Sequence, residues 1–545
     1  MFRREGECDA AKPTACWGTV RFLSVESSSL LRNNHPPAGV KIGEKQAHFP
    51  DFAQLGEIVR LSLNFLQAER HDPYGGSCRF DLQGQRRAII ISVRYFKSRY
   101  FLVYYRSNHK NGEMCMCGFC GFTGQVENRD QVLKEMAAVI THRGPDSEGY
   151  YLDDGVAMAF RRLSIIDLES GSQPIYNEDK SLVLMFNGEI YNYRDLRRKL
   201  LDAGHSFYTE TDSEVLVHGF EEWGEDLLPK LRGMFAFAIW NPGDQSLFIA
   251  RDYFGIKPMH YTVLPDGELL YASEIKSILQ HPGFVKEFNP AALDNYLSFQ
   301  YSLPKETFFK NVFCLPPAHF LRFQKGKVTE LRYWEPVFHP EEEMTLEEAV
   351  DAVDRVFTDS VEAHRISDVE VGCFLSGGVD SSFVASYFGG QKAFTVGFDN
   401  GSHYNESAYA AELAKEVGID HYTHLITEEE YWEALPKVQY HLDQPLADPS
   451  CIALYFVSKL AAEHVKVVLS GEGADELFGG YRIYHEPTSL ARYQKLPRWL
   501  RKAAARLVSA LPFDFKGKSF LTRGSKTLEE RFIGNAYMFT QKEKD

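Results

Sequence analysis

The chain has 545 residues, a formal net charge of −15 and a hydrophobic fraction of 44%. This length predicts about two to four domains, and the composition is that of a globular protein rather than a disordered or fibrous one. No apolar stretch reaches the ~18 residues of a membrane-spanning helix, and the first residues lack the apolar core of a signal peptide. Nine cysteines are few and odd in number, which favours a reduced, cytoplasmic protein without a disulfide framework.

Residues 1–115 differ from the rest of the chain in charge and in pattern. They carry 17 basic and 11 acidic residues, whereas the remainder carries a net charge of −21. Their apolar stretches show no sustained helical or strand period. Three interpretations are open: a leader domain, a removable segment, or upstream sequence that is not part of the working protein.

From Met116 onward the pattern changes to short apolar runs separated by turns. This pattern predicts an α+β domain with largely antiparallel sheets, extending to about residue 325. The expected elements are a helix at 130–141 and strands at 156–160, 162–166, 181–186, 235–240 and 246–250.

After about residue 345 the predicted helices and strands alternate. The expected helices lie at 346–363, 381–388 and 406–417, and the expected strands at 369–375, 393–396 and 465–470. This alternation predicts a doubly wound parallel sheet. The stretch 334–343, rich in Pro and Glu, is expected to link the two domains.

Cys117 is the candidate nucleophile of the first domain. A thiol becomes a strong nucleophile once a base removes its proton. If Cys117 were the first residue, its own α-amino group, with a pKa near ~8, could be that base. A small residue such as Cys also permits removal of a preceding initiator Met116. Two alternatives are a metal site, because Cys115, Cys117 and Cys120 form C-x-C-x-x-C, and a plain buried cysteine.

Several polar residues lie in apolar stretches, where packing alone does not explain them. The segment 142–146, HRGPD, follows a predicted helix, and Arg162 begins an apolar run. Asn187 offers an amide donor, and Gly188 lets the backbone approach a ligand. Asp212 lies near a helix start, where it could bind a ligand or cap the helix.

Taken together, these residues resemble the glutaminase domain of the class II, or N-terminal nucleophile (Ntn), glutamine amidotransferases. The resemblance spans about 116–325 and includes the blocks 231–240, 251–259 and 273–276. It implies an Ntn-hydrolase-type αββα fold in which Cys117 attacks the glutamine side-chain amide, with Asn187 and the Gly188 N–H as oxyanion hole.

The same resemblance implies a set of glutamine-binding residues. Arg162 would hold the α-carboxylate and Asp212 the α-amino group. A fixed guanidinium suits a carboxylate, and donors aimed at a developing oxyanion suit amide hydrolysis. The complete implied set is Arg162, Leu163, Ser164, Ile165, Ile166, Asn187, Gly188, Glu189 and Asp212.

A second motif, SGGVDSS at 376–382, follows a predicted strand and opens a helix. Backbone N–H groups and a helix N-terminus at such a turn favour an anion, although a Gly-rich turn is often purely structural. The motif resembles the pyrophosphate loop of ATP-pyrophosphatases, which adenylate a carbonyl oxygen and release pyrophosphate. Carboxylates at 472–476 are either a solvated acidic turn or, beside this loop, part of a Mg²⁺ site with Asp380 and Asp475 as ligands.

With FTVGF at 394–398, DQPLADPS at 443–450 and SGEGADELFGGY at 470–481, the chain resembles the glutamine-hydrolysing asparagine synthetases from Met116 to about residue 492. The implied reaction converts ATP, aspartate and glutamine into asparagine, glutamate, AMP and pyrophosphate through a β-aspartyl-AMP intermediate. Glu472 would lie near the acyl-adenylate and assist the attack of ammonia. The implied ATP-binding residues are Leu375, Ser376, Gly377, Gly378, Asp380, Ser381, Val396, Ser470 and Gly471.

The resemblance also implies a domain division and partners. We expect 1–116 to lie outside the mature enzyme, a glutaminase domain at 117–325 and an ATP-pyrophosphatase domain at 345–545, which lacks a C-terminal segment typical of the family. Glutamine, aspartate and ATP are the expected partners, with Mg²⁺ as cofactor, a possible homodimer and no nucleic acid.

We expect the ten basic residues of 491–526 to form a helix face that docks on the acidic synthetase domain. The alternatives are another class II amidotransferase, such as a β-lactam-synthetase-like or peptide-tailoring enzyme, and an inactive nucleotide-binding relative.

Overall fold

The computed structural model describes residues 18–22, 45–49, 105–106, 116–337, 344–399, 405–531, 538–539 and 541–544, except residues 169, 304 and 514. Most of the expected extension 1–116 and of the expected link 334–343 lies outside the described residues. Within the extension, β1 (Gly18–Phe22) pairs antiparallel with β2 (Lys45–Phe49).

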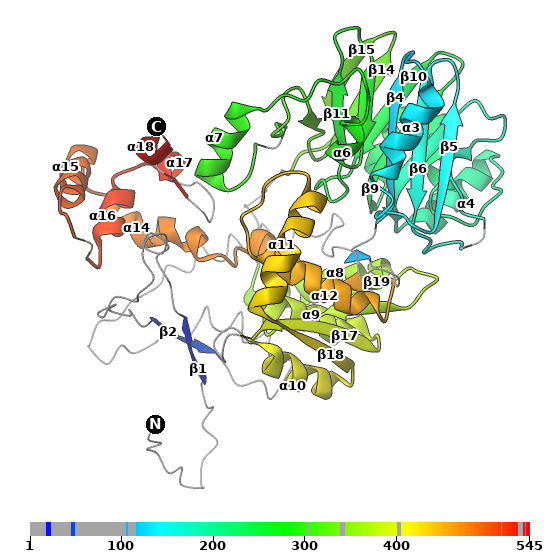
Figure 1. Cartoon of the computed structure of the whole chain (residues 1–545). Coiled ribbons are helices and arrows are strands. Elements are labelled where there is room, and N and C mark those ends of the chain that lie inside the picture. The colour runs from blue at the N-terminus through cyan, green and yellow to red at the C-terminus, as the bar shows by residue number, and fades with distance from the viewer. Residues whose placement is uncertain are drawn as a thin grey trace.

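Two six-stranded antiparallel sheets form the first part of the molecule (Figure 1). In spatial order, the first sheet contains β15 (Lys327–Arg332), β14 (His319–Gln324), β10 (Ser246–Arg251), β9 (Gly233–Asn241), β8 (Val183–Ile190) and β7 (Ile175–Tyr176). The second contains β13 (Phe313–Cys314), β11 (His260–Val263), β12 (Leu269–Ala272), β4 (Gly118–Thr123), β6 (Val156–Arg162) and β5 (Ser147–Leu152).

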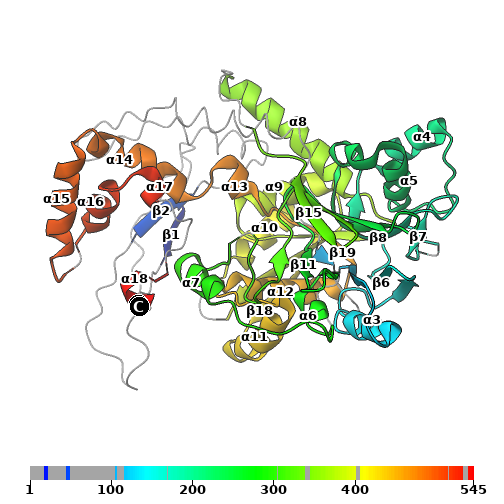
Figure 2. The same ribbon diagram turned by 90° about the horizontal axis from the view of Figure 1, so that it is seen from above.

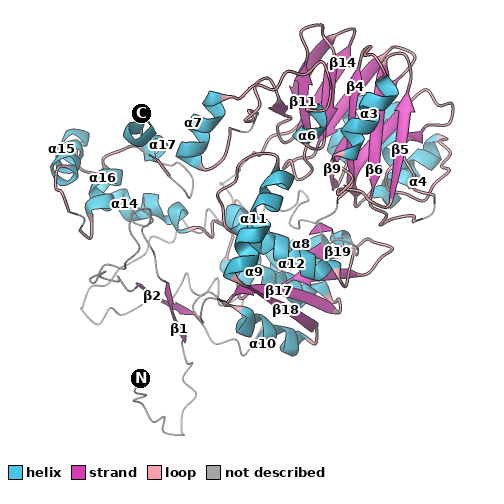
Figure 3. Ribbon diagram, viewed as in Figure 1, coloured by secondary structure: helices cyan, strands magenta, loops and turns pink. Residues whose placement is uncertain are grey.

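Side-chain alternation along the strands separates three apolar layers. In β9, Met234 and Ala236 face the core between the sheets, whereas Phe235 and Phe237 join an outer layer with the helices that cover the first sheet. Those helices are α4 (Tyr193–Ala203) and α5 (Glu214–Trp223), and α3 (Arg129–Ala138) and α6 (Ile275–Ile278) cover the other sheet. The expected αββα arrangement is therefore confirmed, and Figure 3 shows its sheets by secondary structure.

Some expected elements differ from the structure. The strand expected at 162–166 is wrong, because β6 ends at Arg162 and residues 163–166 form no strand. The Leu163 N–H donates instead to Cys117 Sγ at 3.3 Å, and the Ser164 N–H donates to Asp146 Oδ2 at 3.0 Å. Apolar residues alone therefore could not distinguish a strand from a turn that contacts the Cys117 thiol.

A doubly wound sheet forms the second part of the molecule, as expected. Its order is β18 (Asp420–Ile426), β17 (Lys392–Phe398), β16 (Val371–Phe374), β19 (Val467–Leu469) and β3 (Tyr105–Arg106), and all of these pair in parallel except β3. The strand order reverses between β16 and β19, which is where doubly wound sheets bind ligands.

Helices cover both faces of this sheet. Cys373 and Ala393 pack with the helices of one face, and Phe374 and Phe394 pack with α12 on the other. The first face carries α8 (Leu346–His364), α9 (Val379–Phe388) and α10 (Ser407–Val417), and the second carries α11 (Glu428–Leu442) and α12 (Ser450–Ala462). Capping boxes at Thr345 and Thr427 begin α8 and α11.

The C-terminal helices form a group that extends away from the sheets (Figures 1 and 2). Arg523 and Arg531 pair with Glu486, and Arg498 pairs with Glu530, all within this group. These ion pairs lie among the C-terminal helices themselves, so the expected docking of the basic residues 491–526 on the acidic synthetase domain stays a prediction. The group comprises α14 (Glu486–Gln494), α15 (Arg498–Ser509), α16 (Lys518–Gly524) and α17 (Leu528–Arg531).

The remaining described elements are α7 (Pro290–Phe299), α13 (Ala474–Phe478), α18 (Gln541–Lys544) and the 3₁₀ helices at Gly224–Lys230 and Arg482–His485. Among the described residues, the helices are all too short or too polar to cross a bilayer.

Two sequence motifs meet where the two parts of the molecule contact each other. Asp443, at the end of α11, accepts a hydrogen bond from Ile275 N at 2.6 Å and pairs with Lys276 Nζ at 2.7 Å. Gln444 Oε1 accepts from Phe308 N at 3.1 Å. Contacts between the blocks 273–276 and 443–450 therefore fix the positions of the two parts relative to each other.

Glu274 continues this contact toward the interior. Its carboxylate accepts hydrogen bonds from Arg143 Nη1 and from His142 Nε2, each at 2.9 Å, and pairs with Lys276. Burial raises the pKa of Glu274, but the His142 hydrogen bond and the positive charges of Arg143, His142 and Lys276 outweigh it and hold the pKa well below its usual range.

Glu274→Gln is expected to lower the free energy of unfolding at pH 7 by about 3–5 kcal/mol, because removing one partner leaves buried positive charges uncompensated. A lowered carboxyl pKa contributes stability above the unfolded-state value of about 4.3, and this contribution is lost as pH falls toward the folded-state pKa. The difference between variant and parent should therefore be constant from pH 7 to 5 and shrink below about pH 4. Urea unfolding across this range measures it.

Glu335→Gln is the matched control, because it removes an exposed ion pair with Arg332. This control should change stability by less than about 1 kcal/mol. Equal stabilities of the two variants at pH 7 would contradict a buried role for Glu274.

Candidate active sites

Cys117 lies immediately before β4, buried in the core between the sheets with 7% of its surface exposed. Its Sγ accepts the Leu163 N–H and lies 3.5 Å from the Leu163 carbonyl oxygen. Arg143 Nε donates to the Cys117 carbonyl at 3.1 Å. The sulfur of Cys117 is thus fixed by the backbone of Leu163. Its carbonyl is fixed by Arg143, which in turn bonds to Glu274.

The metal-site interpretation of the cysteines does not fit the described residues. Cys120 faces the apolar layer under α3 and α6, whereas Cys117 faces the core between the sheets. Burial raises the pKa of the Cys120 thiol to about 12. Cys115 lies outside the described residues. Two thiols on opposite faces of one strand cannot share an ion.

Asn187 lies in the middle of β8 with no exposed surface. By alternation its side chain points to the same face as Met185, into the core that contains Cys117. Neither its Nδ2 nor its Oδ1 has a hydrogen-bond partner among the described residues. Burying such an amide without a partner costs free energy, so a fold retains it where a ligand supplies the bond.

The Gly188 N–H is directed to the pocket side of β8. Phe235, its cross-strand neighbour, directs its own N–H and C=O to Asp252, so Gly188 and Phe235 are not a hydrogen-bonded pair. Phe186, two residues before Gly188, donates its N–H to the side chain of Gln173. Ile190, two residues after Gly188, donates its N–H to the side chain of Asp212, and both acceptors line the pocket. The N–H of Gly188 lies on the same edge of β8, between the N–H groups of Phe186 and Ile190.

Gly188 is also needed for the packing of the sheet. A Cβ at this position would lie 2.2 Å from the Met234 carbonyl oxygen of β9. The sequence-based explanation, that glycine allows a ligand to approach, is therefore incomplete, because glycine here also allows the neighbouring strand to approach.

Arg162 ends β6 as a buried side chain whose guanidinium is fixed by backbone carbonyls. Its Nη2 donates to Asp167 O at 2.5 Å and to Ile166 O at 3.3 Å. A Cβ at Gly171 would lie 2.3 Å from Nη2, so only glycine leaves room for this arrangement. Burial lowers the pKa of Arg162, and nearby Cys117 and Asp167 oppose that effect.

Asp212 does not cap the helix that follows it. The N-cap of α5 is Ser213, and Asp212 Oδ2 accepts from Ile190 N at 2.8 Å. The capping interpretation is therefore wrong, and the buried carboxylate is fixed on the edge of β8 instead.

Most of these residues line one pocket. Ser164 and Asn187 are not among its lining residues, and Ser164 instead donates from its backbone to Asp146. No glutamine role was expected for Gly171, Gln173, Thr211 or Ser213, although Thr211 and Ser213 flank Asp212 in the sequence. The lining residues are Cys117, Phe160, Arg162, Leu163, Ile165, Ile166, Gly171, Gln173, Phe186, Gly188, Glu189, Thr211, Asp212 and Ser213.

A second and larger pocket lies at the carboxyl ends of β16, β17 and β19. The loop after β16 is held by Ser381 Oγ, which accepts from Ser376 N at 3.0 Å, while Ser376 Oγ accepts from Gly378 N at 3.1 Å. The chain then enters α9 at Val379. These turns place backbone donors and a helix N-terminus at the pocket, the arrangement that binds phosphates.

The predicted nucleotide residues converge here, with one exception. Gly377 lines a small neighbouring pocket with Tyr409 and Glu412 instead. Gly471 approaches the loop closely, since a Cβ there would lie 2.9 Å from the Asp380 backbone carbon. The predicted residues that line the pocket are Leu375, Ser376, Gly378, Asp380, Ser381, Val396, Ser470, Gly471, Glu472 and Asp475. The structure adds lining residues that include Phe374, Ser450, Leu454, Val457 and Tyr481.

Negative charge accumulates in the second pocket. Burial, followed by the carboxylates of Asp475, Glu476 and Glu472, raises the pKa of Asp380 to about 6. Burial and the same neighbours also raise the pKa of Glu472 and of Asp475. Within the described part of the chain, these carboxylates do not form a set of three metal-ligand atoms. Such a site fits Mg²⁺, which takes one or two carboxylates and completes its shell with water and substrate phosphates.

Comparison with known proteins supports both halves of this arrangement. Residues 116–334 match the glutamine amidotransferase domain family, and residues 352–532 match the asparagine synthase family. Asparagine synthetase [glutamine-hydrolyzing] 1 of Bacillus subtilis (strain 168) is 44% identical over 439 residues, covering 78% of this chain and 68% of that protein. A putative asparagine synthetase [glutamine-hydrolyzing] of Mycobacterium tuberculosis is 39% identical over 454 residues, covering 78% and 69%.

Among solved structures, a glutamine phosphoribosylpyrophosphate amidotransferase from B. subtilis aligns with a TM-score of 0.31 and 15% identity, covering 56% of this chain and 65% of that one. The fold and the two family matches define an Ntn-type amidotransferase joined to a synthetase domain. The chain belongs to the family of glutamine-hydrolysing asparagine synthetases.

Asn187→Leu is expected to leave the free energy of unfolding unchanged or to raise it by up to about 1 kcal/mol, because a near-isosteric apolar side chain replaces an unpartnered amide. Thermal or urea unfolding measures this directly.

Asn177→Leu is the matched control, because Asn177 is equally buried but bonds to Ser181, Glu221 and Leu182 N. This control should lose at least about 2 kcal/mol. If Asn187→Leu lost as much, Asn187 would be part of the structural hydrogen-bond network rather than a ligand-binding group.

Proposed function

We propose that the chain makes asparagine from aspartate and ATP with ammonia that it releases from glutamine. The observation that carries this proposal is the presence of two different pockets on one chain, one built around a buried thiol and one around a phosphate loop. The names of the relatives agree with it.

In the first pocket, the thiolate of Cys117 attacks the side-chain amide carbon of glutamine. The oxygen of that amide becomes an oxyanion, which the Asn187 amide and the Gly188 N–H stabilise by donating hydrogen bonds. Arg162 binds the substrate α-carboxylate, and the fixed carboxylate of Asp212 binds the α-amino group. Ammonia leaves, and water then releases glutamate from the sulfur.

This chemistry needs a base for the Cys117 thiol. The α-amino group of a chain that begins at Cys117 serves as that base, because its pKa lies near ~8 and it is attached to the same residue. Where Met116 is bonded to Cys117, that nitrogen is a peptide amide and cannot accept a proton. We therefore propose that the working enzyme starts at Cys117, with a glutaminase domain at 117–325 and a synthetase domain at 345–545.

In the second pocket, the β-carboxylate of aspartate attacks the α-phosphate of ATP, pyrophosphate leaves, and β-aspartyl-AMP forms. Ammonia then attacks the acyl carbon, AMP leaves, and asparagine results. The loop 376–378 and the helix start at Val379 hold the phosphates, and the nearby Ser470 and Gly471 contact the base. Glu472, which lines this pocket, takes a proton from the attacking ammonia.

Mg²⁺ fits the carboxylates of this second pocket. Asp380 and Asp475 are the residues that we propose as its ligands, because both line the pocket and both carry a raised pKa in a crowded acidic environment. The ion would neutralise charge on the phosphates and on the departing pyrophosphate.

Separation of ammonia from water favours this two-site arrangement. Free ammonia at pH 7 is largely protonated and not nucleophilic, so a protected path between the pockets keeps it reactive. The contacts of Asp443 and Gln444 with the first part of the chain fix the distance that such a path crosses. A cytoplasmic location, a homodimer and the absence of nucleic-acid binding remain predictions from the sequence.

A chain that begins at Met116 and loses that methionine should hydrolyse glutamine, whereas the unprocessed chain should be at least about 100-fold slower because the thiol lacks its base. Glutamate release measures the rate, and N-terminal sequencing establishes which form is present. Cys117→Ala in the shorter chain is the inactive control. Equal rates from the processed and unprocessed chains would show that another group activates Cys117.

Cys117→Ala should abolish asparagine formation from glutamine but spare formation from added ammonia, because the second pocket remains intact. Asp380→Ala should abolish AMP release from ATP and aspartate with either nitrogen source. Cys314→Ala, which removes another thiol of the first part of the chain, is the control and should retain both activities.

The same assays distinguish the alternatives. Loss of both activities in Cys117→Ala would count against two separable sites. AMP release that requires a different acceptor acid would indicate another class II amidotransferase. Saturable ATP binding without any AMP release would indicate an inactive relative.

A further inference from the structure

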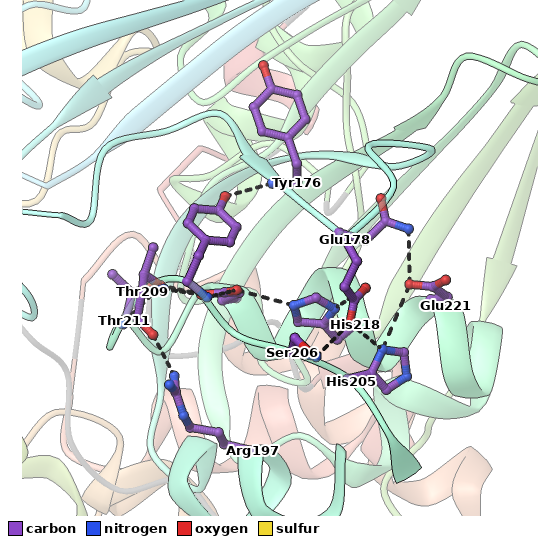
Figure 4. Close-up of polar contacts among 12 residues, drawn as sticks. Tyr176, Glu178, Arg197, His205, Ser206, Thr209, Thr211, His218 and Glu221 are labelled. Atoms are coloured by element: carbon purple, nitrogen blue, oxygen red, sulfur yellow. Dashed lines mark hydrogen bonds and ion pairs between the residues drawn. The ribbon is translucent and has the colours of Figure 1, made fainter. Parts of the chain in front are cut away.

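Four potential metal ligands converge on the outer side of the first sheet, and none of them lines either pocket (Figure 4). Glu178 follows β7, His205 follows α4, and His218 and Glu221 lie one turn apart on α5. One ligand atom from each residue lies within 4.8 Å of all the others. Three separate segments of the chain therefore contribute to one cluster, which we call the Glu178 cluster.

The spacing within the Glu178 cluster matches that of ligands around one ion. His218 Nδ1 lies 3.2 Å from Glu178 Oε2, and His205 Nδ1 lies 3.2 Å from Glu178 Oε1 and 3.9 Å from Glu221 Oε2. Zinc–ligand bonds of about 2.0–2.2 Å in a tetrahedron place the ligand atoms roughly 3.3 Å apart. Glu221 is exposed, so its side chain can close the remaining distance.

His218 is oriented so that its Nδ1 faces this cluster. Its other nitrogen, Nε2, lies 3.2 Å from the carboxylate of Glu214, which is fully buried. The ring has no exposed surface, and Nδ1 has no hydrogen-bond partner among the described residues. Nδ1 is nevertheless held 3.2 Å from Glu178 Oε2, a separation that an ion bonded to both atoms would also give.

Neighbouring residues also position the other three ligands. Ser206 N donates to Glu178 Oε1 at 2.7 Å, and the buried Asn177 Nδ2 donates to Glu221 Oε2 at 3.0 Å. His205 Nε2 lies 3.6 Å from a carboxylate oxygen of Glu222. Outer partners of this kind, with carboxylates behind the histidines, orient ligands in established metal sites.

We propose that Glu178, His205, His218 and Glu221 bind a divalent transition-metal ion of the zinc type. Two imidazoles and two carboxylates suit zinc better than Mg²⁺ or Ca²⁺, which prefer all-oxygen sites. Two carboxylates also balance the charge of a divalent ion. Four protein ligands leave no open position, so the ion is structural rather than catalytic.

The Glu178 cluster is connected to the Cys117 pocket through Glu214. Glu214, which orients His218, also accepts from Tyr208 N at 2.8 Å and from Thr209 N at 2.7 Å. The Thr209 hydroxyl lies 2.8 Å from that of Thr211, which lines the Cys117 pocket. An ion at the cluster therefore stiffens the segment that presents Thr211 and Asp212, independently of the reaction proposed above.

Zinc titration of the full chain tests this proposal, with a chromophoric chelator as competitor. The protein carries Cys117→Ala so that the nucleophilic thiol does not compete, and millimolar Mg²⁺ occupies carboxylate sites. We expect one zinc ion per chain and an increase in the thermal unfolding midpoint on adding zinc. His218→Gln, Glu178→Gln and Glu221→Gln should each weaken binding by at least about tenfold and remove most of the thermal shift.

His424→Gln is the matched control, because it removes a histidine that pairs with Glu430 outside the Glu178 cluster. This variant should bind zinc as the parent does. Glu221→Gln keeps the test valid if the buried His218→Gln does not fold, since Glu221 is exposed. Failure to bind one equivalent of zinc, or binding that survives all three ligand substitutions, would overturn the proposal and leave His218 as a protonated link between two carboxylates.

Discussion

The carboxylate of Glu274 links the nucleophile to the second half of the molecule. On one side it fixes Arg143, which bonds to the carbonyl of Cys117, and on the other it pairs with Lys276, which bonds to Asp443. A buried group of charges is stable only when every member is paired, so the arrangement tolerates little displacement. The position of the thiol and the position of the synthetase sheet are therefore set by one network.

Both pockets contain groups that the fold does not satisfy by itself. Asn187 is buried without a hydrogen-bond partner among the described residues, whereas the equally buried Asn177 is fully used. Asp380 and its acidic neighbours raise one another's pKa. Each arrangement is unfavourable in the free protein and becomes favourable when a ligand of the opposite character binds.

The carboxylates of the Glu178 cluster have different neighbours from those of the second pocket. There Glu178 Oε2 lies 3.2 Å from His218 Nδ1 and Glu221 Oε2 lies 3.9 Å from His205 Nδ1, and the two carboxylates also accept hydrogen bonds from Ser206 N and Asn177 Nδ2. In the second pocket, by contrast, Asp380, Glu472 and Asp475 lie beside other acids. A closed, doubly supported ligand set belongs to a permanent ion, and an open acidic pocket belongs to an ion that arrives with its substrate.

The sequence by itself determined the fold class, the thiol and the two binding motifs, because these depend on local periodicity and on residue types such as the Gly-rich loop 376–382. Only the tertiary structure decided that 163–166 is a turn around Cys117, that Asp212 is fixed on β8 rather than capping α5, and that Arg143 bonds to the Cys117 carbonyl. It also brought together Glu178, His205 and His218, which share no motif. Contacts between residues far apart in the chain leave no periodic signal, because they arise only when sheets and helices pack.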